Sequence, residues 1–223
     1  MSHFFYIYIM IFDLSKTTAI ANTFIAELRD ETLQKDSMRF RKNLERLGVF
    51  FAHEISKSLT YVEIETHTPL GIAKTMVLKQ QPVLATILRA GLPMQHGFLS
   101  VFDKAECAFI TAYRKSKKNG DFIIQMEHIS APNLEGKTII LIDPMLATGL
   151  SMVLCAKELI NRFKIEKLHI VAAIASTEGV KHVRANLPKA ALWLGAIDDE
   201  MTSKSYIVPG LGDAGDLAYG VKA

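Results

Sequence analysis

The chain has 223 residues, of which 49% are hydrophobic and 22% are charged, so it can bury a sizeable core as one domain or as one domain with an added lobe. Its 26 basic and 23 acidic side chains leave a formal net charge of +3. That balance is too even to indicate a nucleic-acid-binding surface, although an anionic small molecule remains a suitable ligand.

The first predicted element is an apolar run at residues 3–12. The run lacks a basic region and a small-residue cleavage site, and it is far shorter than the roughly 20 residues that span a bilayer. Its Tyr, Phe and Ile residues favour a β-strand. We therefore expect a strand here, with no targeting peptide and no membrane partner.

Two amphipathic helices are predicted next, because apolar residues recur at spacings of three and four over residues 18–28 and 39–59. Strands and helices alternate after them. The predicted strands cover residues 82–88, 107–113, 121–129, 138–142, 168–174 and 191–197, and the predicted helices cover residues 91–102, 151–163 and 178–187. Continuous apolar strands that alternate with helices indicate an α/β fold with a mostly parallel central sheet flanked by helices. Ligands bind such sheets beyond the carboxyl ends of the strands.

The first strand end that carries residues suited to ligand binding follows residues 138–142. Asp143 comes directly after the buried strand, and a short turn of small residues leads into a helix. Such a turn directs backbone N–H groups and the positive end of a helix to one point, which suits a phosphate. Thr148 and Ser151 add hydroxyl donors, and Asp143 can accept from ribose hydroxyls. A plain strand-to-helix turn with a capping serine explains this segment alone equally well.

Two further segments carry polar groups in unusual settings. Arg89 stands at a strand end before Ala-Gly, where a permanent cation lies beside backbone that a ligand can approach closely. Residues 206–216 hold three glycines, a proline and two carboxylates, which predicts a fixed, irregular loop and neither a helix nor a strand. A surface arginine and a terminal surface loop are the alternatives.

Together, these segments resemble those of the uracil phosphoribosyltransferases. The turn at residues 143–151 is similar to the family's loop for 5-phosphoribosyl-1-pyrophosphate (PRPP), and residues 206–216 are similar to its uracil-binding segment. Shorter segments at residues 39–41, 68–71 and 112–114 also resemble family segments. The resemblance extends from about residue 20 to the end of the chain, and its C-terminal segment is the most specific part.

The resemblance implies a type I phosphoribosyltransferase fold, with a mostly parallel central sheet flanked by helices, a small C-terminal hood and a helical N-terminal region. It implies a single domain over residues 1–223. Within that domain we expect N-terminal helices at 13–60, a PRPP-binding α/β core at 82–198 and a uracil-binding C-terminal segment at 199–223.

The implied activity is that of a glycosyltransferase of pyrimidine salvage, which converts uracil and PRPP to uridine monophosphate and pyrophosphate. The implied catalytic residues are Arg89, Arg114 and Asp213. The implied PRPP-binding residues are Arg89, Arg114, Asp143, Pro144, Met145, Leu146, Ala147, Thr148, Gly149, Leu150, Ser151 and Asp213. The implied uracil-binding residues are Ile207, Gly212, Asp213 and Ala214. Mg²⁺ would enter on the pyrophosphate, so no protein metal site is expected.

A main-chain site suits uracil chemically. Uracil presents an acceptor, a donor and an acceptor at O2, N3 and O4, and fixed backbone groups can match this edge while leaving the amino group of cytosine without an acceptor. Pro209 and the neighbouring glycines provide the rigidity and the close approach. Uracil N1 then displaces pyrophosphate at the ribose C1, and arginines and Mg²⁺ stabilise the leaving group.

One residue of the PRPP loop departs from the family pattern, and one basic segment has two interpretations. Leu150 stands where the PRPP loop carries Gly or another small residue, and a positive φ there would cost on the order of 1 kcal/mol. The basic run at residues 114–121 is either a solvated, hairpin-like arm or a cover over the pyrophosphate, and within it Arg114 alone has family support.

Alternative functions remain open. A phosphoribosyltransferase for another base would share residues 143–151 but would have no reason to keep residues 206–216. A non-enzymatic regulator on the same fold would sense pyrimidine nucleotides and bind RNA, but it would need a basic face. A net charge of +3 without a dense Arg/Lys stripe gives that regulator little support, so we expect no nucleic-acid partner. The resemblance further implies a homodimer or a larger homo-oligomer, and GTP as an effector in some members. Cys107 and Cys155 lie far apart in apolar runs, which indicates buried thiols and a cytoplasmic location.

Overall fold

The computed structural model describes residues 10–116 and 122–222, with side chains described outside residues 113–125. Most of the apolar run at residues 3–12 lies outside this part. Its last residues belong to β1 (Ile11–Asp13), which pairs in parallel with β10 (Ala191–Asp198) at the edge of the main sheet.

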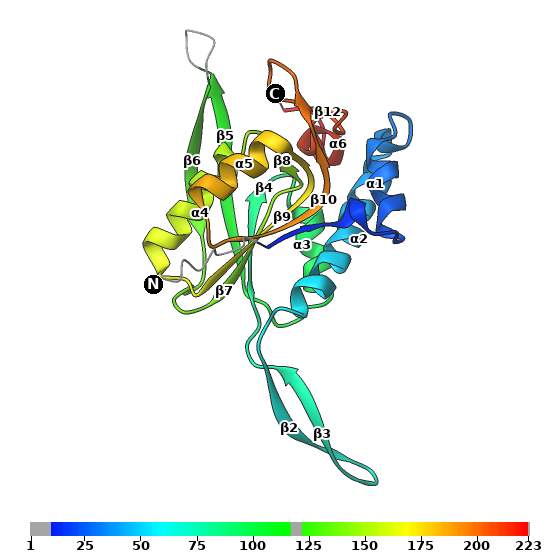
Figure 1. Ribbon diagram of the computed structural model, residues 1–223, viewed down its shortest axis with the longest axis vertical. Helices are drawn as coiled ribbons and strands as arrows, with labels where there is room; N and C mark the ends of the chain where they lie inside the picture. The colour runs from blue at the N-terminus through cyan, green and yellow to red at the C-terminus, as the bar shows by residue number, and fades with distance from the viewer. Residues whose placement is uncertain (1–9, 117–121, 223) are drawn as a thin grey trace, which may run out of the picture.

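Within the described part, an eight-stranded sheet forms the centre of the molecule in the order β1-β10-β9-β7-β4-β5-β6, with β8 paired to β9 (Figure 1). Its other strands are β4 (Val83–Leu88), β5 (Cys107–Ser116), β6 (Phe122–Ser130), β7 (Thr138–Ile142), β8 (Met145–Leu146) and β9 (Lys167–Ser176). All of these pairs are parallel except β5 and β6, which are antiparallel. The predicted, mostly parallel sheet is therefore confirmed.

Both faces of the sheet are covered, because successive strand residues point in opposite directions. On β7, Ile140 and Ile142 pack into one apolar cluster, and Ile139 and Leu141 pack into the other. Figure 1 shows the helices that complete these two layers. The first layer holds α1 (Ala21–Arg29), α2 (Ser37–Ser56) and α3 (Leu92–Leu99), and the second holds α4 (Leu150–Phe163) and α5 (Thr177–Asn186). Short 3₁₀ turns precede α1 and α2 (Leu14–Lys16 and Leu33–Lys35).

Sequence analysis did not predict the hairpin of β2 (Tyr61–Thr68) and β3 (Gly71–Leu78). These strands pair with each other along their whole length and project from the body of the protein (Figure 1). Their residues are almost all exposed, so neither strand buries a face within one chain. A second hairpin, β5–β6, carries the basic run, and its strands pair as far as Ser116 and Phe122. Residues 117–121 lie outside the described part.

The C-terminal segment is more regular than predicted. β11 (Glu200–Met201) pairs with β12 (Ile207–Val208), and α6 (Ala214–Tyr219) begins soon afterwards. The expectation of neither helix nor strand over residues 206–216 is therefore wrong at both ends of that range. The helix begins where it does because the Asp213 carboxylate accepts a hydrogen bond from the backbone N–H of Asp216 at 3.0 Å, which caps its first turn.

The described residues bear on two expectations, which concern membrane-spanning segments and the burial of the two cysteines. None of their helices is long and apolar enough to cross a bilayer. Cys107 and Cys155 are free thiols; Cys155 is buried as expected, whereas Cys107 is partly exposed.

Candidate active site

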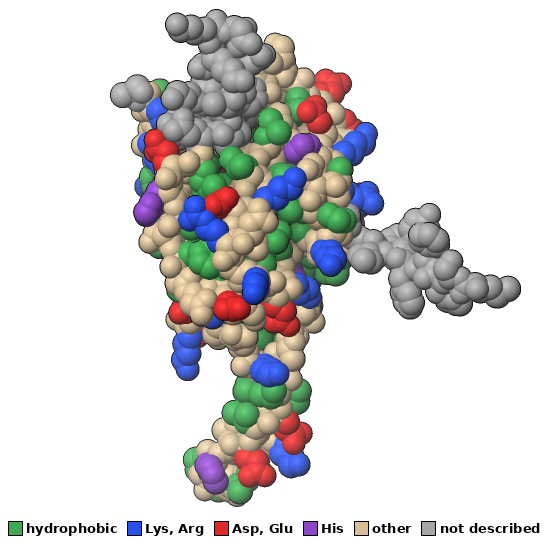
Figure 2. All heavy atoms as spheres, turned by 90° about the vertical axis from the view of Figure 1, so that its left-hand side faces the viewer, with side chains coloured by type: hydrophobic (Ala, Val, Ile, Leu, Met, Phe, Trp, Pro, Cys, Tyr) green, Lys and Arg blue, Asp and Glu red, His purple; other side chains and the backbone are tan. Residues whose placement is uncertain are grey.

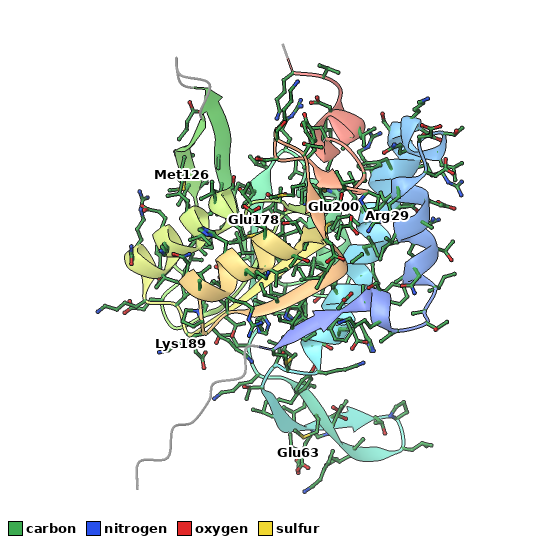
Figure 3. All side chains as sticks on the ribbon, turned by 45° about the horizontal axis from the view of Figure 1, so that its top comes forward. Arg29, Glu63, Met126, Glu178, Lys189 and Glu200 are labelled. Atoms are coloured by element: carbon green, nitrogen blue, oxygen red, sulfur yellow. The ribbon has the colours of Figure 1, made fainter. Side chains whose placement is uncertain are left out.

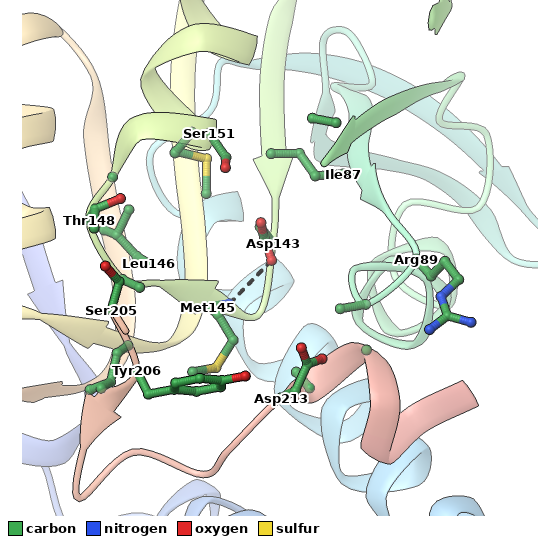
Figure 4. Close-up of a pocket in the computed structure, with 18 of the residues that line it drawn as sticks. Ile87, Arg89, Asp143, Met145, Leu146, Thr148, Ser151, Ser205, Tyr206 and Asp213 are labelled. Carbon is green, nitrogen blue, oxygen red and sulfur yellow. Dashed lines mark hydrogen bonds between the residues drawn. The ribbon is translucent and has the colours of Figure 1, made fainter. Parts of the chain in front are cut away.

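A pocket of about 490 Å³ opens beyond the carboxyl ends of β4 and β7, as expected for a parallel sheet. Its walls come from the turn after β7, the segment after β4 and the C-terminal segment (Figure 4). These are the three segments that sequence analysis selected. The fold brings them together although the first and the last of them lie more than a hundred residues apart in the chain.

The turn after β7 forms the largest part of the wall. All of residues 143–151 line the pocket except Pro144 and Leu150. Asp143 accepts a hydrogen bond from the backbone N–H of Met145 at 3.3 Å, which tightens the start of the turn. Gly149 has φ +78° and directs the chain into α4, so the N-terminus of this helix faces the pocket. Backbone N–H groups, the Thr148 and Ser151 hydroxyls and the helix dipole thus converge there, which suits an anion.

The neighbouring α5 supports this turn from behind. The Ser176 hydroxyl donates to the Ala147 carbonyl at 2.6 Å and accepts from the Gly179 N–H at 2.8 Å. Gly179 lies so close to the turn that a Cβ atom there would be 2.2 Å from the Ala147 carbonyl oxygen. The position of the turn is therefore set by its packing on α5. Sequence analysis missed both Ser176 and Gly179.

Leu150 does not have the strained conformation considered from its sequence position. The left-handed residue is Gly149, and Leu150 is the first residue of α4, with a side chain that is 41% exposed. The cost of a positive φ therefore does not arise at Leu150.

Arg89 follows β4 and lines the pocket, as expected. Its guanidinium donates to the Gly220 carbonyl at 3.0 Å and contacts the Asp216 carboxylate at 3.5 Å. In Figure 4 its side chain turns toward this C-terminal segment and away from Asp143. The side chain of Arg114 lies outside the described part of the structure. Lys222 also lines the pocket, and sequence analysis missed this second cation.

The opposite wall consists of Ile207, Gly212, Asp213 and Ala214, all of them expected there. Ile207 and Ala214 are buried, and Gly212 has φ +91°, a conformation that favours glycine. Asp213 faces the pocket while one of its oxygens caps α6. Tyr206 adds an aromatic ring beside Met145 (Figure 4); sequence analysis included it in the segment but did not select it as a site residue.

The thiol behind the turn is chemically inert. Burial, together with the nearby negative charge of Asp143, raises the pKa of Cys155 to about 12. Cys155 therefore stays protonated at neutral pH and is unsuited to nucleophilic chemistry.

The pocket offers few metal ligands. Among the residues described, no three His, Cys, Asp or Glu side chains gather as a metal site. Asp143 and Asp213 do provide two carboxylates on facing walls (Figure 4). Mg²⁺ prefers oxygen ligands and is commonly held by one or two carboxylates together with substrate phosphates, so this donor set fits an ion that enters with a phosphorylated substrate.

Sequence comparisons with known proteins agree on one family. The family model described as uracil phosphoribosyltransferase matches residues 15–221. A uracil phosphoribosyltransferase from Porphyromonas gingivalis is 49% identical over 92% of this chain and 95% of its own length. One from Thermococcus gammatolerans is 36% identical over 88% of this chain and 87% of its own. The solved structure of the AQ2163 protein from Aquifex aeolicus has a TM-score of 0.85 and 29% identity, covering 96% of this chain and all of that one.

Proposed function

Because this chain belongs to the uracil phosphoribosyltransferase family, we propose that its pocket binds PRPP and uracil side by side. The protein is a glycosyltransferase of pyrimidine salvage, which converts uracil and PRPP to uridine monophosphate and pyrophosphate. Its fold is the type I phosphoribosyltransferase fold that the resemblance implied. The roles assigned to single residues are our proposal.

In this proposal, the turn at residues 143–151 binds the ribose and the 5-phosphate of PRPP. The 5-phosphate accepts hydrogen bonds from the backbone N–H groups around Thr148 and Gly149 and from the Thr148 and Ser151 hydroxyls. The Asp143 carboxylate accepts from the ribose hydroxyls. Support comes from the position of these groups at the N-terminus of α4, where negative charge is favoured.

Arg89 and Arg114 bind the pyrophosphate in the same proposal. Arg89 would exchange the Gly220 carbonyl and the Asp216 carboxylate for phosphate oxygens, which its planar guanidinium can bind in a bidentate manner. Lys222 lies on the same pocket and adds a second positive charge. The pyrophosphate therefore leaves toward a wall that already carries cations.

Uracil lies against Ile207, Gly212 and Ala214 and forms hydrogen bonds mainly with their main-chain groups. Support comes from the irregular backbone at this wall, where the buried Ile207 and Ala214 flank the loop and the positive φ of Gly212 allows the chain to come close to a flat ligand. Backbone N–H and C=O groups that match O2, N3 and O4 reject cytosine, because its amino group would face a donor.

In the chemical step, the bond between uracil N1 and the ribose C1 forms, the bond between C1 and the pyrophosphate oxygen breaks, and the N1 proton is released. Positive charge develops on the ribose ring, and negative charge develops on the departing pyrophosphate. Asp143 and Asp213 face the ribose as it becomes positive, and Arg89 stabilises the pyrophosphate. Bound Mg²⁺ would neutralise part of the pyrophosphate charge, with Asp143 and Asp213 as the carboxylates available to it.

The observation that carries this proposal is the meeting of residues 143–151 and the C-terminal segment on one pocket. Formation of uridine monophosphate from radiolabelled uracil, PRPP and Mg²⁺ tests it, with cytosine, hypoxanthine and orotate run in parallel. We expect turnover with uracil alone. Asp143→Asn should raise the Michaelis constant for PRPP, whereas Asp103→Asn, on the exposed surface, should not. Turnover with another base would contradict the C-terminal assignment, and PRPP binding without any turnover would favour a regulator.

We also propose that the protein forms a homodimer through the β2–β3 hairpin. The hairpin exposes Leu70 fully, Ile72 to 61% and Met76 to 58%. Figure 2 shows hydrophobic side chains on the arm that projects from the body. An isolated two-stranded hairpin is only marginally stable in water, and contiguous exposed apolar groups usually mark an interface. A second copy of the chain is the partner that the family resemblance implies.

Light scattering after size exclusion tests the dimer. The wild-type protein should elute as a dimer, and a Leu70→Asp/Ile72→Asp double variant should elute as a monomer, whereas Glu65→Gln on the same hairpin should remain dimeric. A monomeric wild type or a dimeric double variant would refute the hairpin interface. The effector role of GTP, implied by the resemblance, is tested by running the uracil assay with and without GTP.

A further inference from the structure

A bidentate ion pair joins the N-terminal helix to the end of the central sheet, directly behind the proposed uracil-binding segment. The two terminal nitrogens of Arg29, at the end of α1, donate to the two carboxylate oxygens of Asp198 at 2.8 and 2.7 Å. Asp198 is the last residue of β10. Figure 3 labels Arg29 at this junction, near Glu200 on the strand that comes after β10.

The pair holds both main-chain groups of one residue in the C-terminal loop. Arg29 also donates to the Gly210 carbonyl at 3.0 Å, and the Gly210 N–H donates to Asp198 at 2.9 Å. Gly210 has φ +55°, and a Cβ atom there would be 2.1 Å from the Ile207 carbonyl oxygen. The turn from Ile207 to Gly210 is thus tight, and the pair fixes its far end.

The surroundings strengthen these bonds. Asp198 is 8% exposed, and Arg29 is mostly buried. Burial alone would raise the pKa of Asp198, but the hydrogen bonds from Arg29 and from the Gly210 N–H outweigh it and hold the pKa below its ordinary value. The carboxylate therefore stays ionised, and charge-assisted hydrogen bonds of this kind are roughly twice as strong as neutral ones.

Neither charged residue lines the pocket, whereas Ile207 and Gly212 on either side of Gly210 do. We infer that Arg29 and Asp198 are positioning residues for base recognition, which hold the main chain at Gly210 so that Ile207 and Gly212 present a fixed edge to uracil. This inference rests on the proposed uracil-binding role of the loop. Main-chain groups discriminate uracil from cytosine only while they cannot shift, and the loop between Val208 and Ala214 has no sheet neighbour to fix it.

Arg29→Lys is the decisive variant. A single ammonium group can still contact Asp198, but it cannot form two parallel bonds to the carboxylate and also reach the Gly210 carbonyl. We expect the Michaelis constant for uracil to rise roughly tenfold, which corresponds to losing one charge-assisted hydrogen bond. The Michaelis constant for PRPP should change by less than about twofold, because the described hydrogen bonds of Arg29 go to Asp198 and Gly210 and not to residues 143–151. The inhibition constant of cytosine, used as a competitor of uracil, should come closer to the Michaelis constant for uracil.

Arg39→Lys is the matched control. Arg39 likewise makes a bidentate pair, to Glu27 at 2.9 and 2.6 Å, but its pair joins α2 to α1, and its described side-chain hydrogen bonds do not reach the C-terminal loop. This variant should keep both Michaelis constants. Asp198→Asn is the second test variant, and it should raise the Michaelis constant for uracil, as Arg29→Lys does. Thermal melting of each variant checks that the protein is folded at the assay temperature.

Gly212→Ala separates the inference from the function on which it rests, because Gly212 has φ +91° and lines the pocket directly. If the Michaelis constant for uracil rises in Gly212→Ala but is unchanged in Arg29→Lys, Arg29 has no positioning role, while the assignment of the C-terminal loop to uracil binding still holds. If the Michaelis constant for uracil is unchanged in both variants, the assignment of the loop to uracil binding is wrong as well. An equal rise of the uracil and PRPP constants in Arg29→Lys would show general loosening of the fold and would also refute the positioning role.

Discussion

The contact between α5 and the phosphate-binding turn allows one perturbation to be worked out from the structure. Gly179 does not line the pocket, but a methyl group on its Cα would lie 2.2 Å from the Ala147 carbonyl oxygen and 2.7 Å from that of Leu146. Both oxygens belong to the turn proposed to bind PRPP. Gly179→Ala therefore acts on the site through its backbone alone.

The magnitude depends on the distance that has to be gained. Ordinary van der Waals contacts begin at 3.4 Å, so the Ala147 carbonyl has to move by about 1.2 Å relative to α5. Displacements of about 1 Å in a binding site can reduce the rate about 100-fold, which corresponds to about 2.7 kcal/mol. Overpacking of a buried contact costs about 1–3 kcal/mol of stability. We expect kcat/KM for PRPP to fall about 100-fold and the melting temperature to fall as well.

Steady-state kinetics with PRPP and uracil varied separately test this prediction. The loss should fall mainly on PRPP, since the three atoms nearest to a Cβ at Gly179 all belong to Leu146 and Ala147 of the turn. Lys181→Ala, at an exposed position of the same helix, is the control and should behave as wild type. A Gly179→Ala protein with native kinetics for PRPP would show that the turn can shift freely, and the argument that α5 positions it would be wrong.

Three further predictions concern single side chains. Leu150→Gly should leave the Michaelis constant for PRPP unchanged and should lower the free energy of unfolding by about 1 kcal/mol, because Leu150 is helical and glycine is a poor helix former; a much lower constant would show that Leu150 hinders PRPP. Acid should destabilise the protein between about pH 6.5 and 4, because burial and then the charge of Lys167 lower the pKa of His169 from 6.5 to about 4. The unfolded chain then binds a proton that the folded chain does not, so stability present above pH 6.5 is lost on acidification, by up to about 3 kcal/mol. Denaturant titrations at both pH values should show a smaller loss in His169→Gln, whose side-chain oxygen can accept the bond from Trp193 Nε1, and an identical loss would contradict this cause. Arg89→Lys should lower kcat/KM for PRPP by about tenfold or more, because an ammonium group cannot bind a phosphate in a bidentate manner, and unchanged kinetics would exclude Arg89 from pyrophosphate binding.

The centre of the sheet was predictable from sequence because β4, β7, β9 and β10 are largely apolar runs. Both faces of β7 and β9 are buried, so periodicity is not needed to recognise them. The position of the pocket was then predictable too, since parallel strands place their carboxyl ends at one edge. The site residues after β4 and β7 were therefore accessible to sequence reasoning.

The β2–β3 hairpin was missed for the opposite reason. Its strands have no buried face within one chain, and strict alternation of apolar and polar residues is limited to residues 62–65. The helix α6 was missed because the glycines and the proline around it dominate the local pattern, although Asp213 and, three residues later, Asp216 can cap a short helix. Local composition therefore predicted the turn correctly and hid the helix after it.

The two walls of the pocket also differ in where their support comes from. The turn after β7 is held by Ser176 and Gly179, which belong to the next strand and helix of the same alternating pattern. The C-terminal loop lies outside that pattern, and its contacts reach Arg29, 181 positions away from Gly210 in the sequence. No local motif can reveal such a pair, which explains why sequence analysis found Gly212 and Asp213 but not Arg29 or Asp198.

Separate supports have a functional consequence. Residues that hold the C-terminal loop can change without disturbing the turn that binds the phosphorylated substrate, because the two sets share no side chain among the contacts described. The sugar-phosphate chemistry and the choice of base are thereby controlled by different parts of one pocket. A fold built in this way can keep its reaction while its base specificity diverges, since function resides in the site and not in the sheet that carries it.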